Sequence, residues 1–272
     1  MKKVYLLIII LMIFSQLFSK NYFTLESSLL YFSYSGNDYM KNGLYESIKF
    51  THSNLKSYSE YFQGYQRTYS DNFIFEQFEF KRSYAHFVKT NLKIGFDLKY
   101  TKVANGDFEQ AILGGITGNV YAGNLTFTFS PALNYSFDGT ENKVYQLSGK
   151  INYKYKDLSL NGSTYLFKVK NSEISKEKMR YLHEGSINYY GDLLGIYGIF
   201  SFGEKYLLTT FDNTYLNVSE DEFLHSFHFG ILHYPILRNW SINYEFRKSI
   251  YNNLSKKEYT INAHLLNIYF SW

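Results

Sequence analysis

Apolar and polar residues alternate along most of this chain with a period of two. In residues 125–138 one parity is aromatic or aliphatic, as at Phe127 and Phe129, and the other parity is mostly Thr, Ser or Asn. Residues 143–155 and 90–102 repeat the pattern. Because successive side chains of a β-strand point to opposite faces, each segment predicts a strand with one apolar and one polar face.

The same pattern predicts fourteen strands in all. They fall at residues 22–34, 43–51, 56–68, 74–87, 90–102, 108–120, 124–138, 143–155, 158–169, 180–190, 193–203, 222–234, 238–249 and 258–272. The predicted fold is all-β, a closed antiparallel transmembrane β-barrel with its apolar face outward. Twelve strands are the alternative, because residues 56–68 carry aromatic side chains on both faces. Pro131 stands in mid-strand without an N–H for the ladder, and we expect a β-bulge there.

The connections between predicted strands are mostly short on one side and longer on the other. The turn Lys156-Asp157 contrasts with the long segment 204–221. Bacterial barrels have short periplasmic turns and long external loops, so we expect both chain ends in the periplasm. In the last predicted strand every second residue after His264 is apolar or aromatic, and the final residue is aromatic. We interpret these residues as the signal for the barrel assembly machinery: Leu266, Ile268, Phe270 and Trp272.

The N-terminus has the features of a secretory signal peptide. Two Lys precede eleven apolar residues at 4–14, and small residues at Ser15 and Ser19 allow cleavage. A helix needs about 20 apolar residues to cross a bilayer, so this run is too short. We predict a cleaved signal peptide at 1–19 and one outer-membrane β-barrel domain at 20–272. The chain has no Cys, which excludes a lipoprotein, disulfides and thiolate metal ligands.

Composition supports a barrel over other classes. Aromatic residues make up 21% of the chain, with 29 Tyr, while the mean hydropathy is −0.29 and no second long apolar run exists. These values disfavour a helical membrane protein and fit the aromatic girdles of a barrel. Removing residues 1–19, which carry two Lys and no acid, lowers the formal charge from +4 to about +2, which does not favour nucleic acid. We therefore expect the outer membrane of a Gram-negative-type bacterium.

In its layout the chain resembles the YaiO family of outer-membrane barrels. The cues are residues near the ends of the first three strands: Tyr34-Ser35-Gly36, Asp38, Asn42, Leu44, Tyr45, Glu46, Arg67 and Tyr69. The strand lengths, the short turn at Ser53-Asn54 and the aromatic C-terminus agree over nearly the whole mature chain. The resemblance implies an outer-membrane barrel and supplies no catalytic residue. By size and strand count alone, the chain is also similar to a monomeric porin of the OmpG type.

A barrel of about fourteen strands has room for a channel, although inward side chains or a folded-in loop could close it. The strand registers predict a lumen of mixed charge, with these lining candidates: Glu79, Lys81, Lys93, Asp97, Lys99, Lys150, Lys154, Glu184, Glu245 and Arg247. The first hypothesis is a passive channel for small hydrophilic solutes, saccharides included, with this wall as its filter. The alternatives are a closed structural or surface-binding barrel and an outer-membrane hydrolase or lipid-modifying enzyme.

The His residues give the enzyme hypothesis its candidates. Ser226 and His228 share one face of a strand, but no acid on that strand completes a catalytic set. His225 and His228 are three apart, a spacing that suits a metal site on a helix and not on a strand. We therefore predict no catalytic residues, no metal and no cofactor. The expected partners are outer-membrane lipid, lipopolysaccharide and the barrel assembly machinery, and the sequence leaves the oligomeric state open.

Overall fold

A computed structural model describes most of the chain. It covers residues 22–37, 40–54, 56–71, 74–104, 108–139, 142–171, 178–203, 222–233, 239–252 and 257–271. The predicted signal peptide, the loop 204–221 and Trp272 lie outside the described residues. Within the described part, no helix has the length and apolar character needed to span a bilayer.

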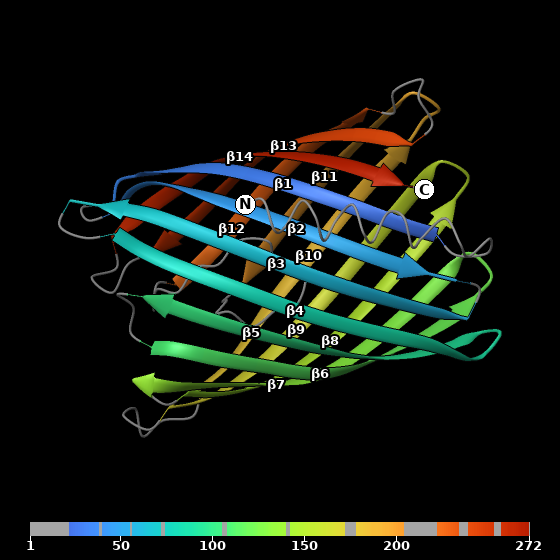
Figure 1. The fold of residues 1–272 in the computed structure, drawn as a ribbon, viewed down its shortest axis with the longest axis horizontal. Coiled ribbons are helices and arrows are strands. Elements are labelled where there is room, and N and C mark those ends of the chain that lie inside the picture. The colour runs from blue at the N-terminus through green and yellow to red at the C-terminus, as the bar shows by residue number, and fades with distance from the viewer. Residues whose placement is uncertain are drawn as a thin grey trace, which may run out of the picture.

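The described residues form fourteen antiparallel strands in one closed barrel (Figure 1). Each strand pairs with its neighbours in chain order, and β1 closes the barrel against β14, as seen where Thr24 lies opposite Ser271. The strands are β1 (Tyr22–Ser35), β2 (Met40–Ser53), β3 (Ser57–Ser70), β4 (Ile74–Lys89), β5 (Leu92–Ala104), β6 (Phe108–Ala122), β7 (Leu125–Gly139), β8 (Asn142–Tyr155), β9 (Leu158–Asn171), β10 (Lys178–Tyr190), β11 (Leu194–Gly203), β12 (Glu222–His233), β13 (Trp240–Asn252) and β14 (Glu258–Ser271).

The predicted closed antiparallel barrel is confirmed, with fourteen strands and not twelve. The ambiguous segment is strand β3, and it is aromatic on both sides of the wall. Phe62 is buried inside, whereas Tyr61 and Tyr65 are exposed outside. Because aromatic residues lie on both faces of this strand, the sequence periodicity alone did not distinguish its inner face from its outer face.

The predicted bulge at Pro131 is wrong. Pro131 lies directly opposite Leu147, and the register between β7 and β8 is continuous. On the other side, the β6–β7 ladder lacks its pairs between Gly115/Ala132 and Gly118/Phe129 but resumes in the same register. The missing N–H therefore interrupts one ladder locally without inserting an extra residue.

The barrel has two distinct ends, which we call the turn end and the loop end. At the turn end, short connections such as Thr90-Asn91, Gly123-Asn124 and Lys156-Asp157 join the strands. β1 begins and β14 ends at this end of the barrel. At the loop end, β11 ends at Gly203 and β12 begins at Glu222. Halves of the lumen are named below after the end to which they are nearer.

The outer face of the barrel is rich in exposed apolar side chains. The outward parity that the sequence predicts on β5, β7 and β8 is exposed, for example at Phe96, Phe129 and Ile151. On β14, Leu266 and Ile268 also face outward, and Phe270 packs against Trp240 with ring centroids 4.9 Å apart. Such a surface is unfavourable in water and suits the hydrocarbon of a bilayer.

Inside, the loop half of the lumen holds a packed apolar layer. Its members come from strands all around the barrel, including Leu30, Phe32, Phe75, Val103, Val144, Phe167, Leu182, Phe223, Tyr251, Tyr259 and Ile261. Leu30, Phe32 and Phe167 are 0% exposed. Complete burial of inward side chains means that they pack on one another and do not line open water.

Several aromatic rings in the lumen lie flat along the wall over glycines. A Cβ at Gly43 would collide with the ring of Phe32, and one at Gly230 would collide with the ring of Tyr197. At Gly64 a Cβ would lie 2.5 Å from Tyr45 Oη. Glycine at these places lets a ring from the neighbouring strand cover the backbone.

Candidate functional site

All ten residues predicted to line the lumen lie on the inward parity of their strands. They differ in how deeply their side chains are buried. Glu79, Lys99 and Glu245 are buried, whereas Lys93 and Lys150 border a cavity and Lys154 is exposed near the turn end. The lining set is therefore divided between groups that are tied into the wall and groups that face open space.

Ion pairs join neighbouring strands on the inner face of the barrel from β1 to β5. Glu26 pairs with Lys49, Lys81 Nζ lies 2.9 Å from Glu60, and Lys99 Nζ lies 2.8 Å from Glu79. Sequence reasoning missed Glu26, Lys49 and Glu60. They occupy inward positions on β1, β2 and β3, where the strand parity was available as a signal.

The second charged group surrounds Glu245 on β13. Its carboxylate contacts Arg247 and accepts a hydrogen bond from the Tyr197 hydroxyl. His228 Nδ1 lies 3.3 Å from Glu245 Oε1, and the same ring contacts Ser226, with Oγ and Nε2 3.2 Å apart. An acid of the neighbouring strand β13 thus lies beside the histidine that contacts Ser226.

This serine, histidine and glutamate order has the outline of a hydrolase triad, but its surroundings do not favour catalysis. Ser226 is 4% exposed, so a substrate carbonyl has little access to its Oγ. Glu245 also binds Arg247 and accepts a hydrogen bond from Tyr197. The cavity described below lies against the opposite wall and is not lined by Ser226, His228 or Glu245. A triad needs room for the reacting atom beside the nucleophile. The contacts are better explained as satisfaction of buried polar groups.

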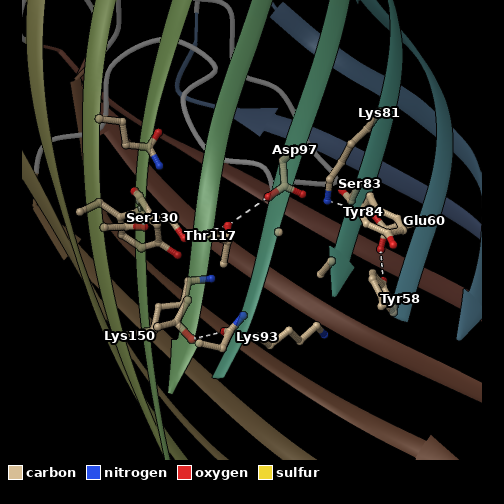
Figure 2. Close-up of a pocket in the computed structure, with 17 residues that line it drawn as sticks. Tyr58, Glu60, Lys81, Ser83, Tyr84, Lys93, Asp97, Thr117, Ser130 and Lys150 are labelled. Carbon is tan, nitrogen blue, oxygen red and sulfur yellow. Dashed lines mark hydrogen bonds and ion pairs between the residues drawn. The ribbon is translucent and has the colours of Figure 1, made fainter. Parts of the chain in front are cut away.

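A cavity of about 230 Å³ opens against the inner wall of β3 to β9 (Figure 2). It lies in the turn half, with Tyr165 of β9 on its border towards the apolar layer. Its charged lining residues are Glu60, Lys81, Lys93, Asp97 and Lys150. Four of these were candidates from sequence, and the structure brings them around one space.

Most of the cavity wall consists of neutral hydroxyl and amide side chains. Ser148 Oγ donates to the Ser130 carbonyl (3.3 Å), Ser130 Oγ donates to Thr117 Oγ1 (3.0 Å), and Thr117 Oγ1 donates to Asp97 Oδ2 (3.1 Å). A row nearer the turn end contains Asn119 and Thr128, joined by a 2.7 Å hydrogen bond. Such a wall can exchange hydrogen bonds with water or with a hydroxylated solute.

Comparisons with known proteins reveal similarity in fold but not in sequence. No protein-family model matches the chain, and no curated protein sequence does. Among solved structures, the toluene transporter TodX of Pseudomonas putida superposes with a TM-score of 0.54 at 9% identity, covering 93% of this chain and 89% of TodX. A FadL homologue of Pseudomonas aeruginosa gives a TM-score of 0.57 at 9% identity, with 93% and 90% coverage.

An anion-selective porin of Comamonas acidovorans is also similar, with a TM-score of 0.51 at 8% identity, covering 93% of this chain and 98% of the porin. Identities this low show the fold alone, which is that of outer-membrane β-barrels. The resemblance to the YaiO family stays a prediction.

Proposed function

We propose that the protein is an outer-membrane channel for small hydrophilic solutes, saccharides among them. In this proposal the exposed apolar outer face lies in lipid and the turn end faces the periplasm. The barrel assembly machinery would insert the chain, and lipopolysaccharide would surround its outer part. The fold similarity to TodX and to the Comamonas acidovorans porin supports a channel.

The observation that carries the proposal is the polar cavity inside the barrel. Its hydroxyl and amide wall can replace the water shell of a hydroxylated solute, and its charged residues can distinguish solutes by charge. At about 230 Å³ it lies below the usual range for drug-sized ligands, which fits a solute of monosaccharide size.

The packed apolar layer favours a second candidate, a closed structural or surface-binding barrel. Side chains such as Phe32 and Phe167, both 0% exposed, fill the loop half of the lumen. A solute could pass only if this layer rearranged. A channel of this design would therefore be gated at its loop half, and a structural barrel would never open.

Single-channel conductance in a planar bilayer tests both candidates. The mature protein should first be refolded in detergent and checked for the gel shift on heating that folded barrels show. We expect stable, salt-dependent conductance steps, with an altered ion preference in Lys150→Gln and Asp97→Asn. A folded barrel that never conducts, in either the parent chain or a variant with a smaller apolar layer, would support the closed barrel and contradict the channel.

A further inference from the structure

We propose that the outer face of β2, β3 and β4 is the contact surface of a homodimer. In this dimer Glu46 of each copy pairs with Arg82 of the other, and the two Gln63 side chains meet at the two-fold axis. Figure 1 shows the three strands side by side on one wall of the barrel. The inference goes beyond the proposed function, because the contact forms whether or not the lumen conducts.

Three polar side chains interrupt the apolar outer face of these strands. Glu46 of β2, Gln63 of β3 and Arg82 of β4 are all exposed, and each lies near the middle of its strand. Their neighbours in the chain face the lumen, as the buried Tyr45 and Phe62 do. Because successive side chains alternate between the two faces, the three polar groups point outward.

The surroundings of these groups are apolar. Arg82 lies opposite Tyr61 of β3 and Leu98 of β5, and Gln63 lies opposite Ile48 of β2. The three facing residues are themselves exposed on the outer face. Hydrocarbon offers no hydrogen bond and no counter-charge, so a charged group at this level of the wall is destabilising in contact with lipid. A protein partner would relieve this cost.

No partner for the three groups comes from the described part of their own chain. None of the three has a hydrogen bond or an ion pair there. Two other polar pairs of the outer face behave differently. Thr164 Oγ1 lies 3.0 Å from His183 Nδ1, and Tyr244 Oη lies 2.7 Å from His264 Nδ1. Those pairs are satisfied within the barrel, whereas the three groups on β2 to β4 await a partner.

The three residues lie on one straight line across the wall. Glu46 pairs with Tyr65 of β3, and Gln63 is two residues nearer the turn end on that strand. The same step leads on, because Gln63 pairs with Phe80 of β4 and Arg82 is again two residues nearer the turn end. Each step crosses one strand and two residues, which is about 8 Å, so Glu46 and Arg82 are about 16 Å apart. That distance is too long for an ion pair within one chain.

The line is nearly level in the membrane because the strands are tilted. A row of directly paired residues starts at Leu25 near the turn end of β1 and rises to Lys168 near the loop end of β9. At a tilt of about 40°, crossing from β2 to β4 rises about 6 Å, and moving four residues towards the turn end descends about 10 Å. Glu46 and Arg82 therefore differ in height by roughly 4 Å, which the long Arg side chain can span.

A level line with this order is self-complementary. Two barrels inserted in the same direction are related by a two-fold axis along the membrane normal, so residues at equal height meet and their order is reversed. An axis at Gln63 places Glu46 opposite Arg82 of the second copy on both sides. An amide carries both a donor and an acceptor, so two Gln63 side chains can bond to each other. The surface thus supplies every charge with its counter-charge.

Sedimentation equilibrium of the refolded mature protein in density-matched detergent tests the ion pairs. We expect a dimer, and we expect Glu46→Arg and Arg82→Glu each to weaken association at least about tenfold, because each places like charges opposite one another. The double variant Glu46→Arg/Arg82→Glu restores opposite charges and should associate like the parent. Lys102→Glu, a charge reversal on the exposed outer face of β5, is the matched control. The gel shift on heating verifies the fold of each variant.

Cross-linking in liposomes tests the position of the axis. The chain has no Cys, so a single introduced Cys reports a single contact. A short bismaleimide should join Gln63→Cys barrels into covalent dimers. Phe129→Cys, on the exposed outer face of β7, is the control and should stay monomeric.

Four results overturn the dimer interface. They are a folded parent barrel that is monomeric at every concentration, single reversals that leave association unchanged, a double variant that does not recover, and equal cross-linking through Gln63→Cys and Phe129→Cys. Lipopolysaccharide phosphate is the competing partner for Arg82. A folded monomer that retains lipopolysaccharide and loses it in Arg82→Glu would assign the surface to lipid and would also overturn the dimer.

Discussion

The loop half and the turn half of the lumen are built on the same strands but are filled differently. On β9, the inward residues run from Ser159 and Asn161 near the turn end to Tyr165 and Phe167 near the loop end. On β8, Lys150 and Ser148 give way to Val144 in the same direction. The inner wall thus changes from polar to apolar along the barrel axis.

The difference shows that alternation and filling are separate properties of a barrel. The alternation of side-chain direction decides whether a residue faces the lumen or the outside, and this alternation continues along the whole strand. Whether the inside is packed or open depends on the size and polarity of the inward residues at one level. Complete burial of Phe32 and Phe167 implies a core in the loop half, whereas the turn half retains a cavity of about 230 Å³.

Truncating the apolar layer should have the largest effect. Phe167 is 0% exposed and stacks on Tyr165 with ring centroids 6.3 Å apart. We expect Phe167→Ala to lower the free energy of unfolding by about 3–5 kcal/mol, because it leaves a cavity in a packed core. Urea unfolding of the refolded barrel measures this. Phe129→Ala on the exposed outer face is the control. An equal loss in the two variants would contradict a packed loop half.

Next in size is the buried ion pair of the loop half. Lys99→Met leaves Glu79, whose side chain is 1% exposed, without its cation 2.8 Å away. We expect a loss of about 3 kcal/mol in unfolding free energy, most of it recovered in the double variant Glu79→Gln/Lys99→Met. Lys41→Met breaks the exposed pair with Asp71 and should cost less than about 1 kcal/mol. Similar losses for the two pairs would show that water reaches Glu79.

Crowding the wall of the loop half should have an intermediate effect. A side chain at Gly64 would meet the Tyr45 ring, so Gly64→Val should cost about 1–3 kcal/mol by displacing that ring. At Gly149 an added Cβ meets nothing within 4 Å, which makes Gly149→Val the matched control. Unfolding in urea compares them. If Gly149→Val were as costly as Gly64→Val, the loss would come from the backbone and not from ring packing.

The smallest effect is expected in the turn half. Asn119→Ala removes the acceptor of the 2.7 Å hydrogen bond from Thr128, but the Thr128 hydroxyl stays beside the cavity, where water can take the place of the lost amide. The free energy of unfolding should fall by about 1 kcal/mol or less. A loss as large as that of Phe167→Ala, measured in the same urea series, would mean that the turn half is also packed and would remove the contrast between the halves.

Much of the fold could be read from the sequence because a strand records its two faces locally. The fourteen predicted segments each correspond to a strand, and the parity of β5, β7 and β8 was correct. The change to apolar inward residues near the loops was also readable, as at Phe75, Val103 and Phe223, once the inward parity was fixed. Pro131 was misjudged because a ladder can skip pairs without changing register.

The alternation within each segment was enough to predict an all-β barrel and the faces of most of its strands, because these follow from a period of two. The choice between fourteen and twelve strands, the two faces of β3 and the meeting of inward residues from different strands depend on how the strands pair in the folded barrel. Lys93 and Lys150 are 57 positions apart in the numbering, yet they end one row because the registers of β5 to β8 align them. The same holds for His228 and Glu245, which are brought together across β12 and β13. Register between strands depends on pairing along the whole barrel, and no single strand encodes it.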